Sequence, residues 1–208
     1  EQLKKYSAEK LPALHHMLGI FGSLQIRNQA TLGGNIGSAS PIGDMLPLLI
    51  ACKALVRLQS ASSGRMIRIE DFLKGYRLTD IHPDELITAV HLQKADSGTI
   101  IRSYKVSRRK NMDISTVSGG FSLKLDQEKV SEVILAFGGM AAQTLRASKT
   151  EEFLTGKPWT RATVEEAMEI LVREFSPLSD ARAGADYRNL VARNLLMKFY
   201  AETITAGQ

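Results

Sequence analysis

The stretch of sequence that decides the fold is Leu32-Gly33-Gly34-Asn35-Ile36-Gly37-Ser38-Ala39-Ser40-Pro41-Ile42-Gly43-Asp44. It is rich in glycine and in side chains with hydroxyl groups, and apolar residues with helical spacing follow it. We therefore expect a glycine-rich loop that leads into a helix, with Asp44 as a candidate cap of that helix. Glycines let the backbone take positive φ and approach a ligand closely, and successive amides in such a loop form an anion site.

Side chains in and beside this loop add donors for phosphate oxygens, namely the hydroxyls of Thr31, Ser38 and Ser40 and the amide of Asn35. A helix N-terminus adds partial positive charge, so a dinucleotide diphosphate fits these properties. Asp44 would instead accept a hydrogen bond from a sugar or ribityl hydroxyl, or it would cap the helix that follows. The stretch matches neither the Walker phosphate loop nor the Gly-x-Gly-x-x-Gly fingerprint, and a loop of this composition is also typical of a simple turn.

The chain has 208 residues, which is enough for one large domain or two small ones. Its 44% hydrophobic and 24% charged residues are typical of a globular protein. The net charge is +5, but the basic residues are scattered and the densest cluster, 108–110, is not interleaved with aromatics. A solvated basic face is therefore favoured over nucleic-acid binding. The single cysteine, Cys52, excludes an internal disulfide and an iron–sulfur cluster held by this chain alone. With no apolar stretch long enough for a bilayer and no secretory signal, we expect a cytoplasmic protein without a membrane partner.

Periodicity predicts helices and short strands in the first half of the chain. The expected elements are a helix over 8–21, an extended segment over 24–31, a hairpin of strands 54–58 and 66–69, a short helix from Phe72 to Gly75, a turn at 82–84 and a strand over 86–92.

A composition shift at 94–99 places a boundary between domains 1–97 and 98–208. The second part is expected to hold a three-stranded antiparallel meander and two helices. Its elements are strands over 100–107, 115–125 and 130–138, a helix opened by a capping box at Thr163–Glu166, and a final helix over 186–204 with Tyr187, Leu190, Val191, Leu195 and Phe199 on its apolar face. The fold class is therefore α+β.

Several ordered blocks resemble the FAD-binding domain of xanthine dehydrogenases and their relatives, which include carbon monoxide dehydrogenase medium subunits and aldehyde oxidases. The blocks are Gln25-Ile26-Arg27-Asn28-Gln29-Ala30-Thr31-Leu32-Gly33-Gly34-Asn35-Ile36, Ser40-Pro41-Ile42-Gly43-Asp44, Asp84–Ile87, Tyr104–Arg109 with Met112–Ser115, Ala136–Ala141, and Leu178–Ala183 with Tyr187-Arg188. The closest likeness is to the iron–sulfur and FAD subunit, the small subunit, of bacterial xanthine dehydrogenases. The resemblance implies the second subdomain of a PCMH-type FAD-binding fold, followed by a flavoprotein C-terminal subdomain.

The resemblance also implies roles for single residues. Residues expected to contact the FAD phosphates and sugar are Thr31, Gly33, Gly34, Asn35, Ser38 and Asp44. Phe21 would lie against the flavin or adenine, Leu86 or Ile87 would pack by the isoalloxazine, and Lys105 would lie near the flavin and its nicotinamide partner. Each of these four also has a structural interpretation: core packing for Phe21, burial in a strand for Leu86 and Ile87, and surface exposure for Lys105.

By the same resemblance the chain is the FAD-carrying segment of a molybdenum hydroxylase of purine catabolism. Electrons would pass from [2Fe–2S] clusters to FAD and on to NAD⁺ or oxygen, while the substrate is hydroxylated at a molybdenum cofactor on a large subunit. No catalytic residue or metal ligand is assigned to this chain. The chain departs from the family at Gly43, where serine is usual, and it lacks the first FAD segment and the iron–sulfur domains. We therefore expect full FAD binding only with a partner chain or that N-terminal piece.

Two alternatives from other classes remain open at this stage. One is a non-catalytic module that binds a nucleotide or anion as part of a scaffold, and the other is a basic nucleic-acid binder.

Overall fold

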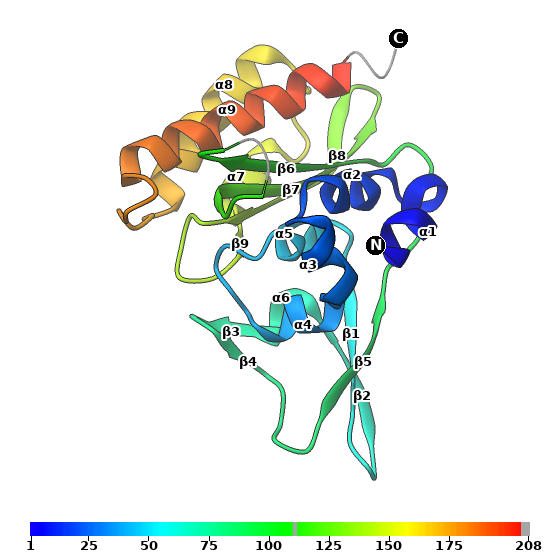
Figure 1. Cartoon of the computed structure of the whole chain (residues 1–208). Coiled ribbons are helices and arrows are strands. Elements are labelled where there is room, and N and C mark those ends of the chain that lie inside the picture. The colour runs from blue at the N-terminus through cyan, green and yellow to red at the C-terminus, as the bar shows by residue number, and fades with distance from the viewer. Residues whose placement is uncertain (110–111, 205–208) are drawn as a thin grey trace.

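A four-stranded antiparallel sheet lies at the centre of the computed structural model, which describes residues 1–109 and 112–204 (Figure 1). The strands, in their order across the sheet, are β6 (Ile100–Ser107), β7 (Ser115–Asp126), β8 (Lys129–Gly138) and β9 (Leu145–Arg146). The predicted three-stranded meander is confirmed, and β9 adds a two-residue edge strand that is too short to show a period. Gln127 and Glu128 join β7 to β8 with φ of 46° and 65°, the backbone of a tight hairpin turn.

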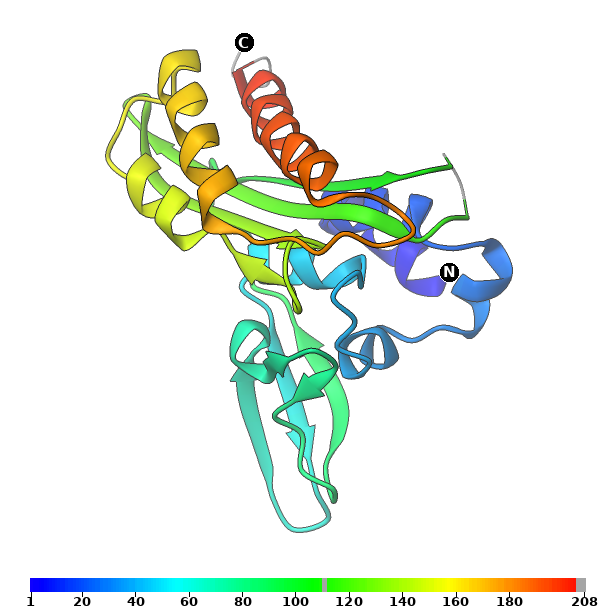
Figure 2. The ribbon, with the colours of Figure 1, turned by 90° about the vertical axis from the view of Figure 1, so that its left-hand side faces the viewer.

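Three helices cover one face of this sheet (Figure 2). They are α7 (Ser148–Leu154), α8 (Arg161–Glu174) and α9 (Ala185–Ile204). Between them and the sheet lies an aromatic core, in which the ring of Phe121 is centred 4.9 Å from that of Phe137 and 5.5 Å from that of Phe199. Side chains alternate along a strand, so this core uses every second residue of β7 and β8.

The opposite face of the sheet is covered by helices from the first half of the chain, α2 (Pro12–Ile20) and α5 (Met45–Ala51). The backbone of α5 approaches β7 so closely that a Cβ built on Gly120 would overlap the carbonyl of Pro47 and the amide of Leu48. Ile134 and Ala136 of β8 also belong to the core on this side. Both halves of the chain therefore depend on the same sheet.

Three short helices complete the N-terminal region: α1 (Gln2–Lys10), α3 (Leu24–Gln29) and α4 (Leu32–Gly37). The single helix predicted over 8–21 is wrong, because Leu11 leaves the helical region and Pro12 starts a new helix at its first position. The extended segment predicted over 24–31 is also wrong. Ser23 caps α3 there, its hydroxyl accepting from the amide of Ile26 at 3.2 Å.

A small lobe extends away from the central sheet (Figure 1). Its elements are β1 (Leu55–Gln59), β2 (Gly64–Arg68) and β5 (Leu86–His91) in one sheet, α6 (Ile69–Phe72), and the short pair β3 (Leu73–Gly75) and β4 (Leu78–Thr79). The predicted hairpin, turn and strand of this region are confirmed. The helix predicted from Phe72 instead ends there, because Leu73 takes an extended conformation that opens β3.

Two details of the last helices differ from the predictions. The cap of α8 is Thr160, whose hydroxyl accepts from the amide of Thr163 at 3.3 Å, so the helix begins before the predicted capping box. Tyr187 and Leu190 are 50% and 52% exposed and do not lie on the apolar face of α9. No helix in the described part of the chain combines the length and apolar character needed to cross a membrane.

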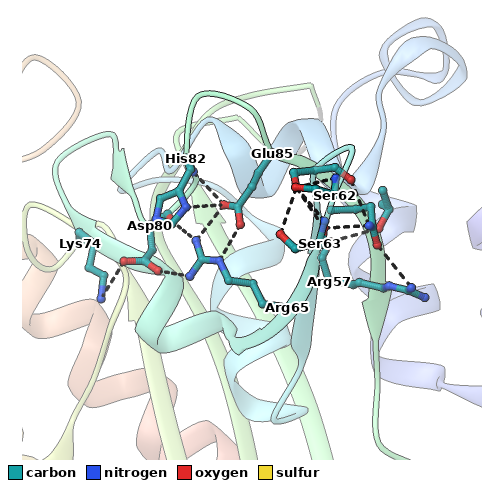
Figure 3. A network of polar contacts seen from close by, with 11 residues as sticks. Arg57, Ser62, Ser63, Arg65, Lys74, Asp80, His82 and Glu85 are labelled. Atoms are coloured by element: carbon teal, nitrogen blue, oxygen red, sulfur yellow. Dashed lines mark hydrogen bonds and ion pairs between the residues drawn. The ribbon is translucent and has the colours of Figure 1, made fainter.

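Arg65 of β2 organises the lobe through ion pairs with two carboxylates (Figure 3). Its guanidinium lies 2.6 Å from Asp80 and 2.7 Å from Glu85. Glu85 also accepts from the backbone amide of His82 at 2.8 Å. The hydrogen bonds from Arg65 and then from His82 lower the pKa of Glu85 to about 2. This network joins β2 to the segment that leads into β5.

We predict that G120A destabilises the fold by at least about 2 kcal/mol, because the added methyl group meets backbone that no rotamer change can move. The free energy of unfolding in urea measures the effect. G19A is the matched control: its Cβ would lie in α2 with no atom nearer than 3.9 Å. We expect it to be neutral or stabilising by up to about 1 kcal/mol. Equal stability of the two variants would contradict this account of α5 packing.

We also predict that E85Q is less stable than the unchanged chain at neutral pH and that this difference disappears in acid. The pKa of Glu85 is lowered on folding, so its contribution is complete above the ordinary value of 4.5 and is lost as pH falls toward about 2. Urea midpoints of both proteins between pH 7 and pH 2 measure the difference. E165Q, which breaks the exposed pair of Arg161 and Glu165, is the control and should change little at any pH. A difference between E85Q and the unchanged chain that persists at the acid end would contradict the prediction.

Candidate functional site

The glycine-rich stretch is not the open loop that the sequence predicts, because its first part forms the helical turns of α4. Thr31 caps this helix, and its Oγ1 accepts from the amide of Gly34 at 2.9 Å. None of the glycines in the stretch takes positive φ; the one residue that does is Ala39, with φ of 40°. The expected role of the glycines in a left-handed backbone is therefore wrong.

Four residues predicted to contact FAD lie along one side of α4: Thr31, Gly34, Asn35 and Ser38. Their spacing of three and four residues places them on a single helical face, and three of them are exposed while Asn35 is half-buried. The Ser38 hydroxyl donates to the carbonyl of Asn35 at 2.8 Å, whereas the Thr31 hydroxyl proton has no acceptor among the described residues. We call these four residues the α4 stripe.

The adjacent side of α4 rests on β5. A Cβ on Gly33 would lie 3.5 Å from Cγ2 of Ile87, and one on Gly37 would lie 3.6 Å from its Cδ1. The glycines therefore let the helix sit flush on Ile87. Leu86, the next residue along β5, points to the other face of the strand and is 71% exposed, so its predicted burial is wrong. The structure brings Gly33 and Ile87 together and leaves Leu86 apart from them.

A cavity of about 500 Å³ opens beside the α4 stripe. Its walls include Phe21, Thr31 and Asn35, which brings three of the predicted site residues to one place. Phe21 is half-buried and packs on the core, which agrees with its structural interpretation, and its place on the cavity wall leaves the cofactor contact a prediction. Arg27 donates to the carbonyls of Phe21 at 2.9 Å and Gly22 at 3.1 Å, and these hydrogen bonds fix the turn that carries the Phe21 ring.

Asn35 carries an unsatisfied acceptor at this cavity. Its Oδ1 is buried and has no hydrogen-bond partner in the described part of the chain. A buried acceptor without a partner is costly, so a ligand that offers an O–H or N–H group is favoured here. FAD has such groups on its sugar, ribityl chain and rings. The residues present therefore fit that cofactor.

Asp44 and Lys105 form a buried ion pair at the start of α5. Nζ of Lys105 lies 2.6 Å from Oδ2 of Asp44, and the two side chains are only 6% and 8% exposed. Asp44 does not cap α5 with its side chain; its other oxygen accepts instead from the hydroxyl of Ser115. Surface exposure of Lys105 is thereby excluded. Burial of two charges is expensive unless they are paired and hydrogen-bonded, as they are here.

The sequence did not indicate the roles of two buried polar residues, of which Ser115 contacts this pair. Ser115 ended one of the matched blocks, but only the fold shows that β7 places it on Asp44. Arg188 was assigned only to the closing helix, yet it is 3% exposed and donates to the carbonyl of Gly139 at 3.0 Å. A charged residue in an otherwise apolar helical face was the available signal.

Arg108 and Arg109, the two described residues of the basic cluster, are exposed. Arg109 lies 3.6 Å from Asp113, and Arg108 donates to the carbonyl of Ala181 at 3.3 Å. Lys110 falls outside the described residues. Among the residues described, no group of three His, Cys, Asp or Glu side chains is placed to hold a metal ion.

Two known families match the chain in succession. The family described as FAD binding domain in molybdopterin dehydrogenase matches residues 1–94, and the CO dehydrogenase flavoprotein C-terminal domain matches residues 102–203.

Curated relatives include large and small proteins. The chain is 36% identical over 200 residues to a xanthine dehydrogenase of Blastobotrys adeninivorans, covering 92% of this chain but 14% of that protein. It is 32% identical to the glyceraldehyde dehydrogenase medium chain of Sulfolobus acidocaldarius, covering 93% of this chain and 68% of the relative. The chain thus spans about one seventh of the xanthine dehydrogenases and two thirds of the medium chain.

Solved structures show the same fold. Carbon monoxide dehydrogenase from Hydrogenophaga pseudoflava superposes with a TM-score of 0.87 at 26% identity, over 92% of this chain and 67% of that one. A reconstituted CO dehydrogenase from Oligotropha carboxidovorans gives 0.85 at 25% identity, over 93% and 67%. The two domain matches, the identity to relatives and the shared fold together show that this chain belongs to the FAD-binding domain family of the molybdenum hydroxylases.

Proposed function

We propose that this chain holds the FAD of a xanthine dehydrogenase-type molybdenum hydroxylase and relays electrons from [2Fe–2S] clusters to NAD⁺ or oxygen. The observation that carries the proposal is the α4 stripe beside its cavity, where the buried Oδ1 of Asn35 has no partner. The family's own description as an FAD-binding domain gives the ligand. When bound, the flavin supplies the redox chemistry, and the protein supplies position and electrostatics.

The residues of the α4 stripe would act on the cofactor in different ways. Asn35 would accept a hydrogen bond through Oδ1 and donate through its amide group. The Thr31 hydroxyl, which already accepts from Gly34, keeps its proton for a phosphate oxygen. The Ser38 proton is engaged by a backbone carbonyl, so Ser38 would act as an acceptor unless it rotates. Gly34 would allow close approach, since its position on the stripe carries no side chain.

Asp44 and Lys105 would form the other end of the site. Asp44 uses one lone pair on each oxygen for Ser115 and Lys105, and the remaining lone pairs can accept from a ribityl or ribose hydroxyl. Lys105 uses one of three protons on Asp44, and a positive charge near the flavin favours its reduced, anionic form. Phe21 would cover a ring of the cofactor. Ile87, rather than the more exposed Leu86, has the packing that suits a wall beside the isoalloxazine.

Complete FAD binding and electron transfer would require other chains or domains. The chain spans 14% of the xanthine dehydrogenase and 68% of the medium chain that it resembles. We therefore propose as partners a molybdenum-cofactor large subunit, an iron–sulfur chain or domain, and a further FAD-binding segment. We also propose a domain division at 97/98, which falls between the two family matches at 1–94 and 102–203. Purine catabolism, a cytoplasmic location and NAD⁺ as acceptor belong to this proposal.

We predict that the chain, co-expressed with these partners, purifies with a yellow chromophore of flavin absorbance. N35A should weaken FAD binding about tenfold, which corresponds to about 1.4 kcal/mol for one lost hydrogen bond. Fluorescence titration of the apoprotein with FAD measures the dissociation constant. N194A, which truncates an exposed asparagine on α9, is the matched control and should leave it unchanged.

The outcome that would contradict the proposal is a complete assembly that is colourless and takes up no FAD. If such a protein bound DNA with a strong dependence on salt, the nucleic-acid alternative would replace the proposed function.

For an assembly that binds FAD, mixing the anaerobically reduced enzyme with NAD⁺ or with oxygen identifies the electron acceptor. Only the true acceptor restores the oxidised flavin spectrum at a catalytic rate.

A further inference from the structure

Arg188 is a buried arginine that the proposed chemistry does not use. It lies on α9, is 3% exposed, and pairs through Nη2 with Asp180 at 2.9 Å. Its Nη1 donates to the carbonyl of Thr116 and, at 3.0 Å, to the carbonyl of Gly139. A buried charge is costly unless it is paired and hydrogen-bonded, so these three partners hold the guanidinium in one place.

Each carbonyl partner of Arg188 is linked to the segment 41–44 by a hydrogen bond of its own residue or of the adjacent residue. The amide of Gly139 donates to the carbonyl of Pro41 at 2.7 Å. Thr116 follows Ser115, whose hydroxyl donates to Asp44. The guanidinium thus binds the backbone at the start of β7 and just after β8. Hydrogen bonds connect both places to the segment 41–44. Arg188 does not contact Asp44 in any of these interactions, so it acts through its neighbours.

The geometry of this junction suits arginine in particular. Gly139 has φ of 82°, and a Cβ on it would overlap the carbonyl of Thr116 and lie 3.1 Å from Nη1 of Arg188. The carbonyls therefore converge on one planar group with fixed N–H directions. A lysine ammonium is a compact point charge, so it could not bind both carbonyls and Asp180 with the same geometry.

We propose that Arg188 is a positioning residue of the flavin site, which fixes the Asp44 carboxylate against Lys105 by clamping the backbone at Thr116 and Gly139. This inference rests on the proposed function, in which Asp44 contacts the cofactor. It adds a residue of the last helix, α9, to a site whose other members come from residues 21–44 and from β5, β6 and β7. Loss of Arg188 therefore weakens FAD binding only as long as Asp44 is present.

The test is a double-mutant cycle of R188M and D44N in the chain co-expressed with its proposed partners, with the FAD dissociation constant as readout. We expect R188M to weaken FAD binding at least tenfold in the unchanged background and less than twofold in the D44N background. R193M is the matched control on the same helix: Arg193 pairs with Glu169 at 2.6 Å at the surface, and its loss should leave FAD affinity unchanged. Urea unfolding of each variant separates affinity from stability.

Additive effects of R188M and D44N would overturn the inference, because they would show a general structural role. If D44N weakens FAD binding and R188M does not, the positioning role is wrong while the proposed function stands. If D44N leaves FAD affinity unchanged, Asp44 is not a contact and the inference fails. If the unchanged protein takes up no FAD, the proposed function itself fails. Should R188M not fold, R188K replaces it in the double-mutant cycle. It keeps the charge but loses the paired carbonyl contacts, so we expect the same result.

Discussion

The packing of α5 on the bare backbone of β7 is the constraint on which the rest of the structure depends. Gly120 has no side chain, so the backbone at Pro47 and Leu48 can lie directly against the strand. This close approach gives the central sheet two buried faces, one covered by each half of the chain. It also brings the start of α5, and with it Asp44, to the strands that carry Lys105 and Ser115.

The candidate site follows from that junction. One end is the α4 stripe, which lies on the side of α4 next to the one where Gly33 and Gly37 contact Ile87. The other end is the buried pair of Asp44 and Lys105. The stripe offers an unpaired acceptor and a free hydroxyl proton, while the pair offers charge in a place that water reaches poorly. Electrostatic interactions are stronger there than at the exposed basic residues, which salt screens.

The sequence predicted β7 and β8 well because the polar residues at 126–129 mark the turn between them and Gly138-Gly139 marks the end of β8. It predicted α3 poorly because none of its residues is buried, and Leu24 and Ile26 are each 52% exposed, so no apolar stripe marks the helix. The glycines of α4 favour a loop by intrinsic propensity, whereas the Thr31 cap and the packing of α4 on β5 and α5 stabilise them in a helix.

The sequence indicated candidate site residues but not the hydrogen bonds and ion pairs that connect them. Thr31, Asn35 and Phe21 were chosen as FAD contacts, and the structure brings them to one cavity, which supports their proposed role without testing it. Asp44 was expected to cap a helix, since a local pattern cannot show a partner 61 residues away. The buried position of Arg188 depends on the packing of the last helix, which a pattern of residues does not determine.

The most direct test of the central claim is an experimental structure of the assembled protein with FAD bound. The account predicts that the cofactor lies along the α4 stripe with an O–H or N–H group on Oδ1 of Asn35, and that a sugar or ribityl hydroxyl contacts Asp44 while Lys105 stays paired. FAD bound elsewhere, with the α4 stripe and Asp44 free of it, would contradict the account.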